Sequence, residues 1–109
     1  MPCTKPCPIE YTINLIGHKW KVLIIRNLLN NGIQRFSELD RGIDGISQKM
    51  LTQQLRDLEK DGLVKREVYP VVPPKVEYSL TELGLSLKPV MDMMSKWGTD
   101  RLSEVNSVV

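Results

Sequence analysis

The chain has 109 residues, of which 41% are hydrophobic and 26% charged, and its net charge at neutral pH is +2. This length suits one domain with a single small core, and the composition excludes a mostly disordered chain, a collagen or a coiled coil. The charge is too small to indicate nucleic-acid binding by itself. The longest purely apolar run, 22–25, is far too short to cross a membrane.

The first residues, 1–7, are predicted to form an arm rather than a helix, since proline recurs among them and cannot donate a helical hydrogen bond. No apolar stretch typical of a secretory signal occurs there, so we expect a cytoplasmic protein. Cys3 and Cys7 are too few for a four-ligand zinc site, and cytoplasmic thiols are normally reduced. We therefore expect no metal, no cofactor and no disulfide framework.

Two helices are predicted after the arm. The spacing of Ile9, Ile13 and Ile16 gives a helix over 8–16 an apolar stripe. A second helix, over 19–30, carries apolar residues on both sides and is expected to be the central helix of the core. The following segment, 33–35, is too short for an independent strand but can pair as the edge of a small sheet.

A helix-turn-helix is predicted next. It consists of a short helix over 36–41, a turn containing Gly42 and Gly45, and a helix over 48–60 with Ser47 as its N-cap. The turn between the helices is the feature that distinguishes this motif from one longer helix.

Two extended segments, 63–69 and 75–80, are rich in valine and tyrosine and predict a β-hairpin. Pro70, Pro73 and Pro74 lie between them, where proline cannot take part in a ladder, and predict a stiff extended tip. The fold class is therefore mainly α with a small antiparallel β-hairpin, which is a winged helix-turn-helix.

The last predicted helix covers 81–102, begins at Thr81 and is kinked by Pro89. Its sustained apolar stripe either completes the core or packs against a second copy of the chain, and we favour a dimer through the N- and C-terminal helices. The predicted interface residues are Ile9, Ile13, Leu83, Leu87, Val90, Met94 and Trp97. The domain is expected to span 8–102, with a frayed tail over 103–109.

The outward face of the 48–60 helix combines residue types that read DNA in the major groove: Arg and Lys reach guanine, Gln pairs with adenine, and Thr contacts the thymine methyl. The candidate DNA-binding residues on or next to this helix are Ser47, Gln48, Lys49, Thr52, Gln53, Arg56 and Lys60. No acid lies among them, although a polar outer face is also typical of any surface helix. Lys65, Arg66 and Lys75 of the hairpin either reach phosphate or only keep the strand edges solvated.

Basic and acidic residues are equal in number over 33–79, which argues against a binder that ignores base sequence. Cys7 stands directly before the first helix, where the helix dipole lowers the pKa of a thiol. It is a candidate redox or electrophile sensor, and the alternative is a surface cysteine without a role.

Three blocks of the chain resemble the HxlR-type family of bacterial winged helix-turn-helix transcriptional regulators, which are distant relatives of the MarR type. They are CPIEYTINLIGHKWKVLIIRNL (7–28), RFSELDRGIDGISQKMLTQQLRDLEKDGLVKREVYPVVPPKVEYSLTELG (35–84) and LKPVMDMMSKWG (87–98). The resemblance implies a dimeric regulator with its recognition helix at 47–60 and its wing at about 69–76. In the family members that sense electrophiles or disulfide stress, the reactive cysteine matches Cys7.

The expected function is thus a dimeric, sequence-specific DNA-binding repressor that acts on a palindromic operator. Its switch is either thiol modification by an oxidant or electrophile, or a small-molecule ligand. The alternative is a winged-helix protein-interaction module without DNA binding. An enzyme is not expected, because the chain has one His and no glycine-rich phosphate loop.

Overall fold

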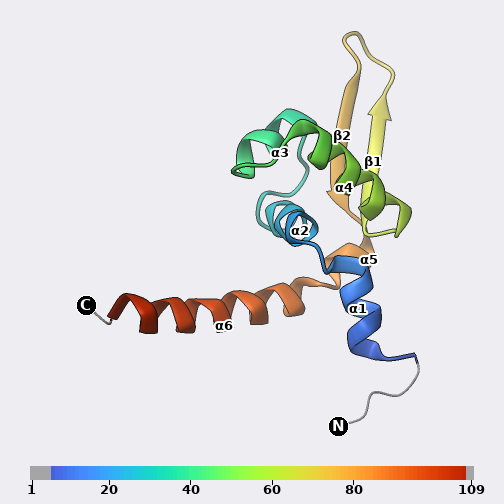
Figure 1. Cartoon of the computed structure of the whole chain (residues 1–109). Helices are drawn as coiled ribbons and strands as arrows, with labels where there is room; N and C mark the ends of the chain where they lie inside the picture. Colours follow the sequence, from blue (N-terminus) through green and yellow to red (C-terminus); the bar gives the residue numbers. More distant parts are fainter. Residues whose placement is uncertain (1–5, 108–109) are drawn as a thin grey trace.

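The computed structural model describes residues 6–107, which form six helices and one two-stranded antiparallel sheet (Figure 1). In chain order the elements are α1 (Pro8–Ile16), α2 (Lys19–Asn31), α3 (Phe36–Gly42), α4 (Gln48–Lys60), β1 (Val64–Tyr69), β2 (Lys75–Leu80), α5 (Glu82–Leu85) and α6 (Lys88–Ser107). The mainly helical fold class with one β-hairpin is confirmed. Most of the predicted arm (1–5, with Cys3) and the last residues of the predicted tail (108–109) lie outside the described residues.

Side-chain caps set the beginnings of three helices. His18 Nδ1 accepts a hydrogen bond from the backbone N–H of Trp20 at 3.2 Å, at the start of α2. Ser47 Oγ accepts from Met50 N–H at 3.0 Å and begins α4, and Thr81 Oγ1 accepts from Gly84 N–H at 3.1 Å and begins α5. Because a cap satisfies N–H groups that the helix leaves unpaired, these boundaries are encoded locally and agree with the sequence prediction.

The hydrophobic core lies where α2, α3, α4 and the start of β1 meet. Its largest fully buried side chains are Ile24, Ile25, Leu39, Leu51, Leu55, Leu58 and Leu63. The α2 helix contributes from two sides, as expected for a central helix, and Leu51, Leu55 and Leu58 form the inward stripe of α4. Packing this stripe against α2 fixes which side of α4 faces solvent.

The hairpin that forms the wing pairs β1 with β2 from Val64 opposite Leu80 to Tyr69 opposite Lys75. Gln34 adds an isolated bridge to Tyr78, with backbone hydrogen bonds of 2.9 and 2.8 Å in the two directions. The segment before α3 therefore pairs with the sheet as predicted, and it ties the wing to the helix-turn-helix.

The C-terminal region differs from the predicted single helix over 81–102. It is divided into α5 and α6, with Ser86 and Leu87 between them and Pro89 in the first turn of α6. Proline would collide with the carbonyl four residues earlier in a continuous helix but is tolerated in a first turn. A break rather than a kink is the result.

The predicted frayed tail is also corrected over part of its length, because α6 continues to Ser107. Exposed ion pairs join successive turns, from Lys96 to Asp100 at 3.0 Å and from Arg101 to Glu104 at 3.0 Å. Pairs at this spacing favour the helix, and no glycine or proline follows Gly98.

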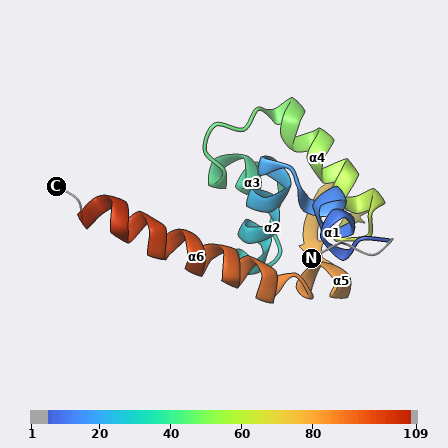
Figure 2. The same cartoon turned by 60° about the horizontal axis from the view of Figure 1, so that its bottom comes forward.

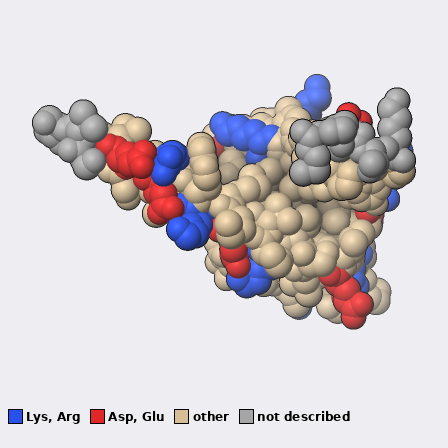
Figure 3. Space-filling model, turned by 90° about the horizontal axis from the view of Figure 1, so that it is seen from below, with Lys and Arg blue, Asp and Glu red and all other residues tan. Residues whose placement is uncertain are grey.

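The α6 helix projects from the body of the molecule (Figures 1 and 2). It lies at the end opposite the tip of the wing (Figure 1). The radius of gyration is 16.1 Å, against about 13 Å for a compact domain of this length. The underside, on which α1, α5 and α6 lie, has a broad central area without charged residues, with charges gathered along α6 and at the rim (Figure 3). Within residues 6–107, none of the helices has the length and apolar content needed to span a bilayer.

We predict that Gly84→Ala will disturb the base of the wing. A Cβ at this buried position would collide with the carbonyl oxygen of Leu63 and press on the Leu80 side chain. The free energy of unfolding, measured by urea denaturation, should fall by about 1–3 kcal/mol.

Gly98→Ala is the matched control, since a Cβ there has no atom within 4 Å and the position lies inside α6. It should leave the free energy of unfolding unchanged or raise it by up to about 1 kcal/mol. Equal stability of Gly84→Ala and wild type would contradict the close contact.

Candidate functional site

The outward face of α4 presents the polar residues expected there. Ser47, Gln48, Lys49, Gln53, Arg56 and Lys60 are exposed and Thr52 is half-buried. Thr52 Oγ1 donates to the Gln48 carbonyl at 2.8 Å, so its hydroxyl hydrogen is already used. The structure places this set together on the side of α4 that the core packing leaves open.

The cations of this face are available to a ligand. Among the residues that the structure describes, Lys49, Arg56 and Lys60 form no ion pair, and neither does Arg66 of the wing. The first turn of α4 adds backbone N–H groups, which favour an anion such as phosphate. The face therefore combines uncompensated positive charge with hydrogen-bonding side chains.

A groove of about 320 Å³ separates α4 from the wing. It is lined by Thr52, Leu55, Arg56, Glu59, Arg66 and Tyr78. Arg66 lies directly opposite Tyr78 in the hairpin register, so both project from the strand face that is turned toward α4. Two arginines from different elements thus meet in one groove beside the exposed face of α4.

The other two predicted basic residues of the wing lie on its opposite face. Lys65 pairs with Glu67 at 3.4 Å and Lys75 with Glu77 at 3.6 Å. Strand residues alternate between faces, which separates these pairs from Arg66. Lys65, Arg66 and Lys75 were predicted as one group, but the hairpin separates them. Arg66 is an unpaired cation near α4, whereas Lys65 and Lys75 are paired with acids.

Tyr69 belongs to this paired face as well. The Lys75 ammonium lies over its ring, 5.0 Å from the centroid. A hydrogen bond to the Glu77 carboxylate is the main cause that raises the pKa of the Tyr69 hydroxyl, with smaller effects from burial and Glu67. A phenol is already neutral at physiological pH, so the shift reflects the acidic surroundings of Tyr69 and does not change its charge.

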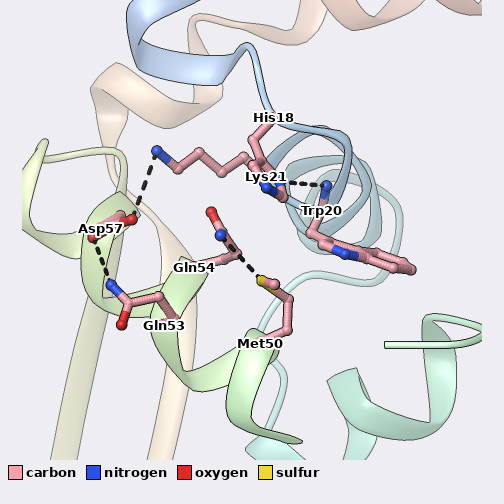
Figure 4. A network of polar contacts seen from close by, with 7 residues as sticks. All are labelled: His18, Trp20, Lys21, Met50, Gln53, Gln54 and Asp57. Carbon is pink, nitrogen blue, oxygen red and sulfur yellow. Dashed lines mark hydrogen bonds and ion pairs between the residues drawn. The ribbon is translucent and has the colours of Figure 1, made fainter. Parts of the chain in front are cut away.

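A polar network connects α4 to α2 (Figure 4). Gln53 Nε2 donates to Asp57 Oδ1 at 3.3 Å, and the Lys21 ammonium of α2 lies 3.9 Å from Asp57 Oδ2. Asp57 is not among the site residues predicted from the sequence. The i,i+4 spacing of Gln53 and Asp57 was a usable signal, whereas the Lys21 contact depends on how α2 and α4 cross.

The predicted dimer faces are largely solvent-exposed in the single chain. On α1, Ile9 and Ile13 are 68% and 57% exposed, and Trp97 of α6 is 67% exposed. Leu83, Val90 and Met94 are exposed too, while Leu87 is half-buried against the chain's own core. Met91, absent from the predicted set, is the α6 residue that packs into that core. Met93, Met94 and Trp97 line an open apolar depression of about 440 Å³.

Cys7 occupies the N-cap position of α1, directly before Pro8, as the sequence predicted. Two expectations for it are corrected: the residue is only 8% exposed, and it is disulfide-bonded rather than a thiol. A depression of about 260 Å³ beside it is lined by Pro6, Cys7, Glu10, Tyr11 and Asn14. Over residues 6–107, no group of His, Cys, Asp and Glu side chains is arranged to hold a metal ion.

A helix-turn-helix followed by a β-hairpin, with basic and amide side chains on the outer face of the second helix, defines a winged helix-turn-helix transcriptional regulator. The model of the HxlR-like helix-turn-helix family matches residues 15–106, and the chain belongs to this family. Members of this family regulate transcription and are not enzymes. The HTH-type transcriptional regulator YybR of Bacillus subtilis is 50% identical over 97 residues, which cover 89% of this chain and 77% of YybR.

Solved structures of two redox-related regulators share the fold. HypR, described as a redox regulator, in its oxidised form is 51% identical, with a TM-score of 0.81 over 86% of this chain and 96% of HypR. The reduced form of the transcriptional regulator YodB from B. subtilis is 42% identical, with a TM-score of 0.74 over 89% of this chain and 91% of YodB. A structure of diamide-treated YodB is similar as well, with a TM-score of 0.72, 41% identity and coverage of 92% of this chain and 95% of YodB.

Proposed function

We propose that this transcriptional regulator is a homodimeric, sequence-specific repressor that binds a palindromic DNA operator through α4 and the wing. The observation that carries the proposal is the outward face of α4, where unpaired Lys49, Arg56 and Lys60 surround Gln53. Phosphate contacts from lysines position a protein on DNA, whereas Gln and Arg at base edges supply specificity. A regulator of this kind acts where the chromosome lies, so the proposal includes a cytoplasmic location.

The apolar faces of α1 and α6 support the homodimer. A single chain leaves Ile9, Ile13, Met94 and Trp97 in water, and large exposed apolar side chains gathered on helix faces are typical of an interface. In the proposed dimer the two copies of α4 lie on the same side. Two symmetric reading helices match a palindromic site.

Thiol chemistry at Cys7 is the proposed signal. Support comes from its position before α1, a helix of the proposed interface, and from the similarity to regulators described as redox-responsive. A disulfide or adduct at Cys7 would change how the two subunits are oriented and move the α4 helices off their half-site spacing. In the reaction with diamide, two thiols lose two electrons and two protons, which reduce diamide to its hydrazine.

The DNA-binding face is tested by Gln53→Ala, Arg56→Ala and Lys49→Ala. Gln53→Ala and Arg56→Ala should change base preference, because both side chains are proposed to lie at base edges. Lys49→Ala should weaken binding to all sequences and lower the salt slope by about 1. Fluorescence anisotropy with duplexes selected from a randomised pool, at several salt concentrations, measures both quantities.

Lys96→Ala is the matched control, since Lys96 is an exposed lysine of α6 that pairs with Asp100. It should leave base preference unchanged. Unaltered affinity and preference in all three α4 variants would show that α4 is not the reader, and a wild type that binds no duplex at low salt would favour a protein-interaction module instead.

The dimer is tested by Met94→Asp, which places a carboxylate in the proposed apolar interface. Burial of an unpaired charge is costly, so this variant should sediment as a monomer at micromolar concentration in analytical ultracentrifugation. Thr99→Asp, exposed on the other side of α6, should remain dimeric. A dimeric Met94→Asp variant, or a monomeric wild type, contradicts the proposed interface.

The thiol switch is tested by reducing the protein and then treating it with diamide or a quinone. Wild type should lose DNA binding, and Cys7→Ser should retain it. If Cys7→Ser responds like wild type while Cys3→Ser does not, the sensing role moves to Cys3. If neither substitution changes the response, the regulator responds to a non-covalent ligand or to no signal.

A further inference from the structure

We infer that Lys21 and Asp57 are positioning residues for Gln53, and that they determine base preference without touching DNA. This inference rests on the proposed function, in which Gln53 lies at a base edge. The observation is the chain of contacts that joins the three side chains (Figure 4): Gln53 Nε2 donates to Asp57 Oδ1 at 3.3 Å, and Asp57 Oδ2 lies 3.9 Å from the Lys21 ammonium.

The contact to Asp57 fixes the orientation of the Gln53 amide. A carboxylate only accepts hydrogen bonds, so the amide must turn its NH₂ group toward Asp57 and its carbonyl oxygen away. One amide hydrogen is used in this bond, which leaves the second hydrogen and the oxygen for another partner. These are the donor and the acceptor that a glutamine uses to pair with the N7 and N6 groups of adenine.

Lys21 determines how firmly Asp57 is held. An exposed Gln–Asp contact along one helix is weak by itself. The Lys21 side chain, however, is only 14% exposed, whereas that of Asp57 is 40% exposed. Its packed stem limits where the ammonium can lie, and within residues 6–107 Asp57 is the acid that pairs with Lys21. The carboxylate is therefore kept on the α2 side of α4, within reach of Gln53.

A different conclusion would be that the ion pair only fastens α2 to α4. The packing of Leu51, Leu55 and Leu58 already does that, because all three are fully buried against the core. Gln54, next to Gln53, faces this packed side and donates from Nε2 to Met50 Sδ at 3.3 Å rather than to Asp57. A purely structural pair would affect stability and overall affinity together, whereas a positioning pair affects the choice of base at one operator position.

The experiment selects duplexes from a pool with a randomised core using the wild-type chain, and then titrates the preferred duplex and its single-base-pair variants. Gln53→Ala first identifies the operator position that Gln53 reads, where discrimination should fall about 5- to 150-fold. Lys21→Met, which keeps the aliphatic stem, and Asp57→Ala should lower discrimination at that same position by about two- to tenfold, because only the ordering of one amide is lost.

Further variants separate positioning from charge and stability. Lys21→Arg, which keeps the positive charge, should retain the wild-type base preference. Asp61→Ala removes an acid at the end of the same helix and should leave the preference unchanged, although each lost acid raises overall affinity for DNA. Gln53→Ala combined with Asp57→Ala should lose no more discrimination than Gln53→Ala alone. Circular dichroism checks folding, and Asp57→Ala alone decides the question if Lys21→Met does not fold.

The outcomes distinguish this inference from the proposed function. If Gln53→Ala alters base preference while Lys21→Met and Asp57→Ala leave every position unchanged, the positioning role is wrong and α4 remains the reader. Additive losses in the double variant also overturn it. If Gln53→Ala changes neither affinity nor preference, base reading by Gln53 fails, and the inference fails with it.

Discussion

The packing of α4 against α2 is the constraint on which the rest of the molecule depends. Leu51, Leu55 and Leu58 are fully buried, in the same core cluster as Ile24 and Ile25 of α2. An α-helix has about 3.6 residues per turn. When one stripe of α4 is buried, the opposite stripe, which carries Lys49, Gln53 and Lys60, must therefore face solvent. The chemistry of the candidate site therefore follows from the core, and a rotation of α4 about its axis would damage both together.

The same core leaves an apolar surface of α6 exposed to solvent. Met91 and Leu87 anchor the start of α6, but the remainder of the helix leaves the body and keeps Met93, Met94 and Trp97 in water. A chain of this length could form a more compact domain if α6 folded back onto its own core. Its projection and the uncharged central area of the underside (Figure 3) are the physical features on which the proposed dimer rests.

Acidic and basic residues are equal in number over 33–79, but they are separated in space. The wing places Lys65 and Lys75 with Glu67 and Glu77 on one face and leaves Arg66 unpaired on the other, beside Arg56. Equal numbers of acids and bases can thus coexist with a locally positive groove. Such an arrangement suits a protein that must recognise a particular sequence, since nonspecific attraction to phosphate stays limited.

The sequence by itself determined the local features. Apolar periodicity and caps such as Ser47 and Thr81 predicted most helix bounds, and the prolines at 70, 73 and 74 predicted the tip of the wing. The spacing of polar residues over 48–60 predicted the outward face of α4. Each of these features depends on neighbours within a few residues. Pro89 was also a local signal, but whether it kinks or breaks a helix depends on the packing of the residues before it. Only the tertiary structure decided that Leu87 and Met91 turn inward, that Cys7 is buried and disulfide-bonded, and that Lys21 reaches Asp57. The packing of Leu87 and Met91 and the contact of Lys21 with Asp57 join residues far apart in the sequence or depend on how helices cross, and no periodicity within a single element specifies them.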